Sequence, residues 1–179
     1  MGADKSPRVA KLDAIQAQVH ERCLKPAGFR KRGRTHNRWA QDGICHVVNF
    51  QMGSAPHRED WGFLWVNLGV RIPDPGETPD PKRFFQEYEC RFRVNLLSFV
   101  QPGTYRGYNG AYFTLDAPPE GPLGRLIHSW RPPKEPTYGG PDVADQIIGL
   151  LEKHGLPMFA SLSSAESYRA NVRTYDSVN

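Results

Sequence analysis

The spacing of apolar residues predicts a helix near each end of the chain. Between Val9 and Cys23, apolar residues recur three or four positions apart, which is the repeat of one face of a helix. Gly28 follows as a suitable left-handed turn to end this helix. Residues 142–155 show the same repeat, and Gly155 is expected to end the second helix.

Between these helices, a repeat of two predicts β-strands. The predicted strands are 35–40, 44–52, 63–72, 90–97 and 111–115. Asp42-Gly43 lies between the first two and is typical of a tight hairpin turn. The order of elements predicts an α+β fold, in which N-terminal and C-terminal helices pack on one face of an antiparallel sheet.

The alternation assigns the strand residues to two faces of the sheet. One face collects apolar side chains and is expected to pack against the helices. Its members are His46, Val48, Phe50, Leu64, Val66, Leu68, Val70, Ile72, Cys90, Phe92, Val94 and Leu96. We expect Val48, Phe50, Val66, Leu68, Phe92 and Val94 to share one buried cluster with Leu12, Ile147 and Leu151.

The opposite face carries amides, arginines and an indole, where lysine, glutamate and threonine would be sufficient for a solvent-facing strand. Amides and arginines make directional hydrogen bonds, and arginine can bind carboxylate or phosphate with two bonds. The candidate ligand-binding residues are Asn49, Gln51, Trp65, Asn67, Arg91 and Arg93. The alternative is that this face is solvated or forms a structural hydrogen-bonded ladder.

The length of 179 residues fits a single domain, 1–179, with irregular proline-rich excursions at 73–81 and 117–141. An apolar fraction of 39% and a charged fraction of 23% are ordinary for a globular protein. No apolar run reaches the roughly 20 residues that a membrane span needs, and the N-terminal residues lack the apolar stretch of a secretory signal. We therefore expect a cytoplasmic protein without a membrane partner.

Positive charge is concentrated in residues 22–41. The net charge is +4, and this segment holds seven basic residues and no acidic one, so the remaining 16 basic and 19 acidic residues give −3. The candidate anion-binding residues are Arg30, Lys31, Arg32, Arg34 and Arg38. They are expected to face solvent and to attract polyanions such as nucleic acid; the alternative is a solvated loop and strand edge.

No sequence motif assigns a catalytic, cofactor-binding or metal-binding residue. The chain has no glycine-rich phosphate loop, zinc-protease motif or nucleophile elbow. Its cysteines, Cys23, Cys45 and Cys90, fit neither a disulfide framework nor a paired metal-ligand pattern. His20 and Cys23 lie three residues apart and could share a metal, but no second pair is close in sequence. We therefore expect no cofactor and no metal.

Four short segments, taken in order, resemble those of a known family. They are Leu24-Lys25-Pro26-Ala27-Gly28-Phe29-Arg30-Lys31-Arg32-Gly33, Asn49-Phe50-Gln51, Asn67-Leu68-Gly69 and Gly155-Leu156-Pro157. Over roughly residues 8–100 and 142–165, the chain resembles the bacterial family catalogued as domain of unknown function 4304. The resemblance implies a fold and a bacterial origin, while the family has no assigned activity to transfer to individual residues.

The interpretation that the sequence favours is a non-enzymatic binding or interaction module that uses the polar face of its sheet. Its partner would be a protein or a small polar or anionic ligand. The first alternative is a nucleic-acid-binding protein that uses segment 22–41, which requires Trp39 and Trp65 near the arginines for base stacking. The second is a small enzyme on the same polar face, which requires a histidine, cysteine or carboxylate beside the amides or Arg93.

Overall fold

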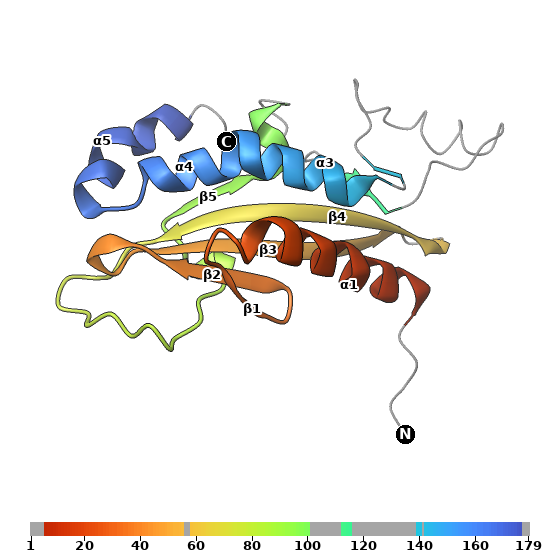
Figure 1. The fold of residues 1–179 in the computed structure, drawn as a ribbon, viewed down its shortest axis with the longest axis horizontal. Coiled ribbons are helices and arrows are strands. Elements are labelled where there is room, and N and C mark those ends of the chain that lie inside the picture. Colours follow the sequence, from red (N-terminus) through yellow and green to blue (C-terminus); the bar gives the residue numbers. More distant parts are fainter. Residues whose placement is uncertain (1–5, 56–57, 101–111, 116–138, 141, 177–179) are drawn as a thin grey trace.

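The fold is seen in a computed structural model that describes residues 6–55, 58–100, 112–115, 139–140 and 142–176. Within these residues, six strands form one antiparallel sheet in the order β1-β2-β3-β4-β5, and the short β6 also pairs with β4 (Figure 1). The N-terminal helix and the C-terminal helices contact this sheet, so the predicted α+β fold is confirmed.

The elements have the following bounds. The strands are β1 Arg30–Arg32, β2 Thr35–Trp39, β3 Cys45–Ala55, β4 Arg58–Arg71, β5 Phe92–Asn95 and β6 Phe113–Thr114. The helices are α1 Pro7–Val19, α3 Val143–Leu150, α4 Leu156–Ser161 and α5 Ala165–Asp176. Two π-helical turns, His20–Leu24 and Leu151–Gly155, extend α1 and α3, and 3-10 turns occur at Gln41–Gly43, Glu87–Glu89 and Leu96–Phe99.

The two glycines that were expected to end helices have different backbone conformations. Gly28 has a positive φ of 86° and ends the N-terminal helix, as expected. The expected helix end at Gly155 is wrong, because α3 runs through the π-helical turn into α4 and Gly155 keeps a φ of −67°. A Cβ at Gly155 would lie 3.2 Å from Leu68 Cδ1, closer than ordinary contact. The glycine therefore allows the helix to approach β4 closely.

The strands differ from the sequence prediction mainly at their ends. The sequence does not predict β1, whose three residues are basic and exposed and therefore show no apolar repeat. β3 and β4 extend past the predicted 44–52 and 63–72 into one long hairpin, whereas β5 is shorter than 90–97. The predicted excursion at 117–141 lies outside the described residues except at 139–140.

The first face of the sheet forms the main core with the helices. All nine residues that the sequence assigns to one cluster belong to it, including Leu68 on β4, Leu12 on α1 and Ile147 on α3, which are fully buried. His46 on β3 is buried in the same layer, where its ring stacks on Phe159 at a centroid distance of 4.7 Å. This part of the face assignment is confirmed.

One predicted core residue lies on the other side of the sheet. Cys90 belongs to a second, smaller buried cluster with Cys45, Val47 and Phe85, instead of the main core. It precedes β5 and follows a 3-10 turn, so the strand alternation does not reach it. This second face is therefore partly covered, which the sequence does not predict.

Candidate binding site on the second face of the sheet

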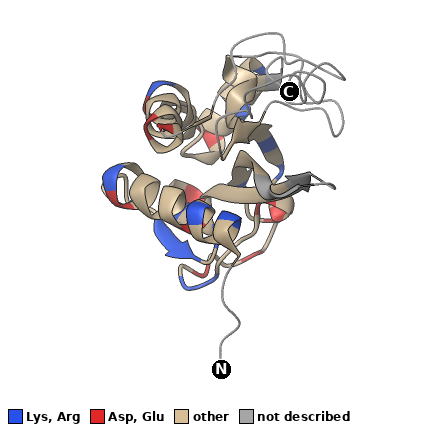
Figure 2. Ribbon diagram, turned by 90° about the vertical axis from the view of Figure 1, so that its right-hand side faces the viewer, with Lys and Arg blue, Asp and Glu red and all other residues tan. Residues whose placement is uncertain are grey.

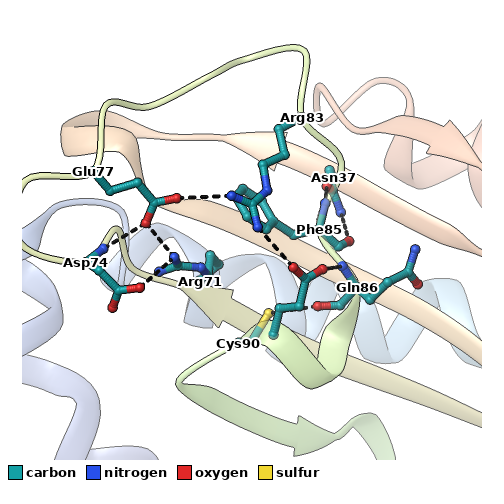
Figure 3. A network of polar contacts seen from close by, with 9 residues as sticks. Asn37, Arg71, Asp74, Glu77, Arg83, Phe85, Gln86 and Cys90 are labelled. Carbon is teal, nitrogen blue, oxygen red and sulfur yellow. Dashed lines mark hydrogen bonds and ion pairs between the residues drawn. The ribbon is translucent and has the colours of Figure 1, made fainter.

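The segment between β4 and β5, residues 73–91, folds across one end of the second face, and we call it the strap. Figure 3 shows the polar network that fixes it. Glu77 accepts hydrogen bonds from the Arg71 guanidinium at 2.5 Å and from the Asp74 backbone N–H at 2.9 Å. These bonds hold the pKa of Glu77 below its usual value, the Asp74 N–H being the main cause. Arg83 adds a contact to Glu77 at 3.4 Å.

Phe85 anchors the strap to the sheet. Its ring is buried, and the guanidinium carbons of Arg71 and Arg83 lie 5.3 Å and 4.5 Å from the ring centroid. The Asn37 side chain makes two hydrogen bonds to the Phe85 backbone, donating to its carbonyl at 3.0 Å and accepting from its N–H at 2.6 Å (Figure 3). Asn37 thus pairs the strap with β2 as a neighbouring strand would.

The two cysteines in the small cluster beneath the strap, Cys45 and Cys90, are not activated thiols. Burial raises the pKa of Cys45 to about 12 and also raises the pKa of Cys90. Cys90 packs against Gly69, where an added Cβ would lie 2.6 Å from its sulfur. Both thiols are therefore protonated and serve as small packing groups.

Beyond the strap, a polar row crosses four strands. Thr35, Asn49, Asn67 and Asn95 lie directly opposite one another in register on β2, β3, β4 and β5. Asn67 and Asn95 are buried, with 7% and 3% of their surface exposed, whereas Asn49 is half-buried. Two of the segments that carry the family resemblance, at 49–51 and 67–69, are thus cross-strand neighbours.

Hydrogen bonds join this row into two chains. In the first, the Leu97 N–H donates to Asn95 Oδ1 at 2.9 Å, Asn95 Nδ2 to Asn67 Oδ1 at 3.3 Å, and Asn67 Nδ2 to Gln51 Oε1 at 3.1 Å. The chain therefore leads from a buried backbone group to Gln51, which is exposed.

The second chain starts in the strap. The Gln86 backbone pairs with Glu89, and the Gln86 side-chain Oε1 accepts from the Thr35 hydroxyl at 2.9 Å. The Thr35 hydroxyl oxygen accepts in turn from Asn49 Nδ2 at 3.0 Å. The two chains end at Gln51 and Asn49, which are two residues apart on β3 and therefore share a face.

An aromatic group borders the ends of these chains. Trp65 lies directly opposite Gln51 in the sheet, and its ring passes over Gly53, where an added Cβ would lie 2.4 Å from the indole. The Trp65 ring has Phe63 and Tyr112 as neighbours, each with a centroid distance of 6.4 Å. Sequence reasoning identified Trp65 but missed Tyr112, because β6 is too short to show an alternation.

The two arginines of the candidate site have different surroundings. Arg91 forms an ion pair with Asp74 of the strap at 3.0 Å, which lowers the pKa of Asp74. Arg93 is exposed on the second face, and its Nε lies 3.8 Å from Glu87 Oε1. Burial raises the pKa of Glu87, and the charge of Arg93 opposes this effect. The structure therefore places Arg93 closer to the polar row than Arg91, because Arg93 lies opposite Gly69 on β4.

The basic segment is only partly the exposed patch that the sequence predicts. Figure 2 shows β1 as an entirely basic strand, and Lys31 and Arg32 are exposed there. Arg30 is exposed too, and it donates to the Pro81 carbonyl of the strap. Arg34 is half-buried, in the turn between β1 and β2.

For Arg38 the expectation of a solvent-facing charge is wrong. It is half-buried on the core side, where it donates to the Ala27 carbonyl at 3.1 Å and lies over the Phe29 ring at 4.9 Å. The alternation of β2 places Arg38 opposite His46, a position that the sequence pattern could have revealed. Burial lowers the pKa of this guanidinium.

The aromatic residues required by the nucleic-acid alternative are engaged elsewhere. Trp39 packs on Phe85 at a centroid distance of 5.7 Å, within the cluster beneath the strap. Trp65 packs with Phe63 and Tyr112. In these contacts, neither indole packs beside the exposed basic side chains of β1.

The histidines give no metal centre in the part of the chain that the structure describes, where no group of three or more potential His, Cys, Asp or Glu ligands occurs. His20 and His36 lie with ring centroids 5.1 Å apart, and His36 is fully buried. Burial lowers the pKa of His36 to about 3, and the nearby His20 and Lys31 act in the same direction. The same described residues contain no helix with the length and apolar character needed to cross a membrane.

These features define an α+β protein whose sheet has one apolar face under helices. The other face carries two hydrogen-bonded chains of polar side chains beside an aromatic group. The chain belongs to the family described as Domain of unknown function (DUF4304), whose profile matches residues 20–161. The matched range contains the complete sheet and both hydrogen-bonded chains of the polar row. Comparison with curated proteins and with solved structures finds no match.

Proposed function

We propose that this chain is a non-enzymatic binding module and that its ligand contacts the second face beyond the strap. The proposed site comprises Asn49, Gln51, Trp65, Asn67 and Arg93. Arg91, the remaining sequence candidate, is a peripheral member because Asp74 of the strap already pairs with it.

The observation that carries this proposal is the state of Gln51. Its side chain is exposed, yet its carbonyl oxygen is fixed by the buried Asn67 amide. An exposed long side chain is normally free to rotate, and ordering it costs conformational entropy. Here the hydrogen-bond chain lowers that cost before any ligand arrives, which favours binding in a single orientation.

The surroundings support recognition of a polar ligand more than catalysis. Glu87 is the carboxylate that lies beside Arg93, but Arg93 pairs with it, and burial keeps the thiols of Cys45 and Cys90 protonated. A mixture of an indole with a few oriented polar groups is typical of sites that bind small molecules. The partner would accordingly be a small polar ligand.

The test is a ligand-observed NMR screen of polar fragments, followed by titration of ¹⁵N-labelled protein with each hit. We expect hits to shift the side-chain NH₂ signals of Gln51 and the indole signal of Trp65. Binding should be lost in Gln51→Ala and Trp65→Ala. It should be retained in Tyr88→Ala, a matched control in which an aromatic ring that is 73% exposed is removed from the strap.

A screen without hits on this face, or hits that bind Gln51→Ala and Trp65→Ala as well as the wild-type protein, would overturn the proposal. Circular dichroism of each variant verifies that the fold is retained, because both substituted side chains lie outside the main core.

A further inference from the structure

The hydrogen-bonded chains determine which atoms the proposed site presents. A backbone N–H can only donate, so the Asn95 atom that meets Leu97 N must be the oxygen. The Asn95 NH₂ group then faces Asn67, whose oxygen must meet it, and the Asn67 NH₂ group faces Gln51. Each amide in this chain is therefore oriented by the one before it, and the orientation does not depend on a choice between oxygen and nitrogen at any step.

At the end of this chain, Gln51 accepts a hydrogen bond through its Oε1. Its Nε2 amide group is consequently left as a donor, and no partner for it is found among the described residues. Gln51 thus presents two N–H bonds at an exposed position.

The second chain gives the opposite result. The Thr35 hydroxyl donates to Gln86 Oε1 at 2.9 Å, so its own oxygen is left to accept. The Asn49 atom that meets Thr35 must then be the NH₂ group. The Asn49 carbonyl oxygen is left as an acceptor, again without a partner within the described part of the chain.

From this arrangement we infer that the site recognises the cis-amide edge of a planar ring, in which a carbonyl oxygen and an N–H lie side by side. This inference rests on the proposed function and specifies its ligand. The ligand oxygen accepts from Gln51, and the ligand N–H donates to Asn49, two residues away on the same face of β3. An ordinary trans peptide group does not match, because its oxygen and N–H point in opposite directions.

The indole supplies the third contact. Trp65 lies directly opposite Gln51 and its indole covers Gly53, so an aromatic surface borders Gln51 on the side away from Asn49. Stacking of flat rings on an indole favours heterocyclic lactams and imides over open-chain carboxamides. Pyridones and pyrimidine or purine bases with a lactam edge belong to this chemical class.

The test uses 2-pyridone as the probe and N-methyl-2-pyridone as its matched control, because methylation removes the N–H and keeps the ring and the carbonyl. We expect 2-pyridone to bind the wild-type protein at least about tenfold more tightly in an NMR titration, the size expected for one lost hydrogen bond that leaves Asn49 unpaired. Equal affinities would overturn the inference.

Two variants test the donor directly. Gln51→Glu keeps an oxygen for Asn67 and replaces the outward NH₂ group by a second oxygen, so the affinity for 2-pyridone should fall by about tenfold or more. Gln51→Met removes both polar ends and should weaken binding similarly, while the fold is retained in both variants because the position is exposed. Undiminished binding to Gln51→Glu would overturn the inference.

A remote variant tests the chain itself. Asn95→Asp replaces the NH₂ group that fixes Asn67, so Asn67 and then Gln51 should turn over and Gln51 should present its oxygen outward. Loss of 2-pyridone binding in a folded Asn95→Asp protein supports the inference, although Asn95 is buried beneath the site and makes no contact with the ligand. If the variant binds 2-pyridone normally, the hydrogen-bond chain does not set the chemistry of the site and the inference fails.

The outcomes separate this inference from the proposed function. If other polar fragments bind the second face and 2-pyridone does not, the binding module stands and the ligand class is wrong. If nothing binds that face, both fail.

Discussion

Acid sensitivity is a direct consequence of the two histidines buried against the main core. His36 and His46 are fully buried, and burial lowers their pKa values to about 3 and about 4. His20 and Lys31 near His36, and Arg38 near His46, carry or can gain positive charge and lower these pKa values further. Between the ordinary value of 6.5 and these lowered values, the unfolded chain binds protons that the folded chain does not.

The sign and size of the effect follow from proton linkage. Because the unfolded state binds more protons, stability falls as the pH falls below 6.5, and it is unaffected by these groups well above that value. At pH 5 each histidine lowers the free energy of unfolding by about 2 kcal/mol, so together they remove about 4 kcal/mol relative to pH 7.5. A small domain has roughly 5–15 kcal/mol in total, so unfolding near pH 4 is expected.

Urea unfolding followed by circular dichroism at pH 7.5, 6 and 5 measures this loss. In His36→Leu the loss between pH 7.5 and 5 should shrink by about 2 kcal/mol relative to the wild-type protein. By geometry, neither ring nitrogen of His36 has a hydrogen-bond partner within the described residues, and Leu is an apolar replacement of similar reach. His154→Asn, at a half-buried histidine stacked on Phe99, is the control and should retain most of the loss. An unchanged pH dependence in His36→Leu would refute this reasoning.

Three further predictions address the core, the strap and the basic edge. Leu68→Ala should cost about 2–5 kcal/mol in urea unfolding, because Leu68 is fully buried beneath the close approach of Gly155, and a cost below 1 kcal/mol would contradict the core assignment. Asn37→Ala should destabilise by about 2–3 kcal/mol, since it leaves the Phe85 N–H and carbonyl unpaired, and should increase amide hydrogen exchange in the strap. Lys31→Glu together with Arg32→Glu should abolish any salt-sensitive retention on heparin while leaving the urea midpoint nearly unchanged; retention that persists would place the polyanion contact elsewhere.

The sequence predicts the main core well because that core has a strong periodic signal. The hairpin of β3 and β4 alternates over many residues, so Phe50 and Leu68 were assigned to the correct face. The same alternation correctly placed Asn49 and Asn67 on the other face. Periodicity requires length, and the errors occur where an element is short or where the chain leaves the sheet.

The strap illustrates what periodicity cannot reveal. Its docking depends on one buried ring, Phe85, and on single side chains such as Asn37, which lies 48 residues from Phe85 in the sequence. Nothing in the pattern at 73–91 indicates that the segment returns to cover part of the polar face. Gly155 is a similar case, because a glycine that ends a helix and one that allows a close approach look identical in a sequence.

The candidate site was predictable by residue type but not by bonding. The alternation placed Gln51 and Trp65 together on one face, and the structure keeps them opposite one another. The direction of each amide depends on Leu97 and on Gln86, and neither carries a sequence signal that connects it with the site. Hydrogen-bond direction is a property of the complete network, so it becomes visible only when all the partners of each amide are in place.

The junction at Gln86 connects the strap with the proposed site. Its backbone pairs with Glu89 of the strap, and its side-chain oxygen accepts from the Thr35 hydroxyl, which accepts in turn from Asn49. If the strap were to undock, Thr35 would be free to donate to Asn49, and Asn49 could turn its NH₂ group outward. An apolar strap would cover the sheet equally well but would leave that amide without a defined orientation. The polar docking of residues 73–91 therefore does more than cover the sheet. It orients Asn49, because a satisfied hydrogen-bond network specifies one arrangement of donors and acceptors.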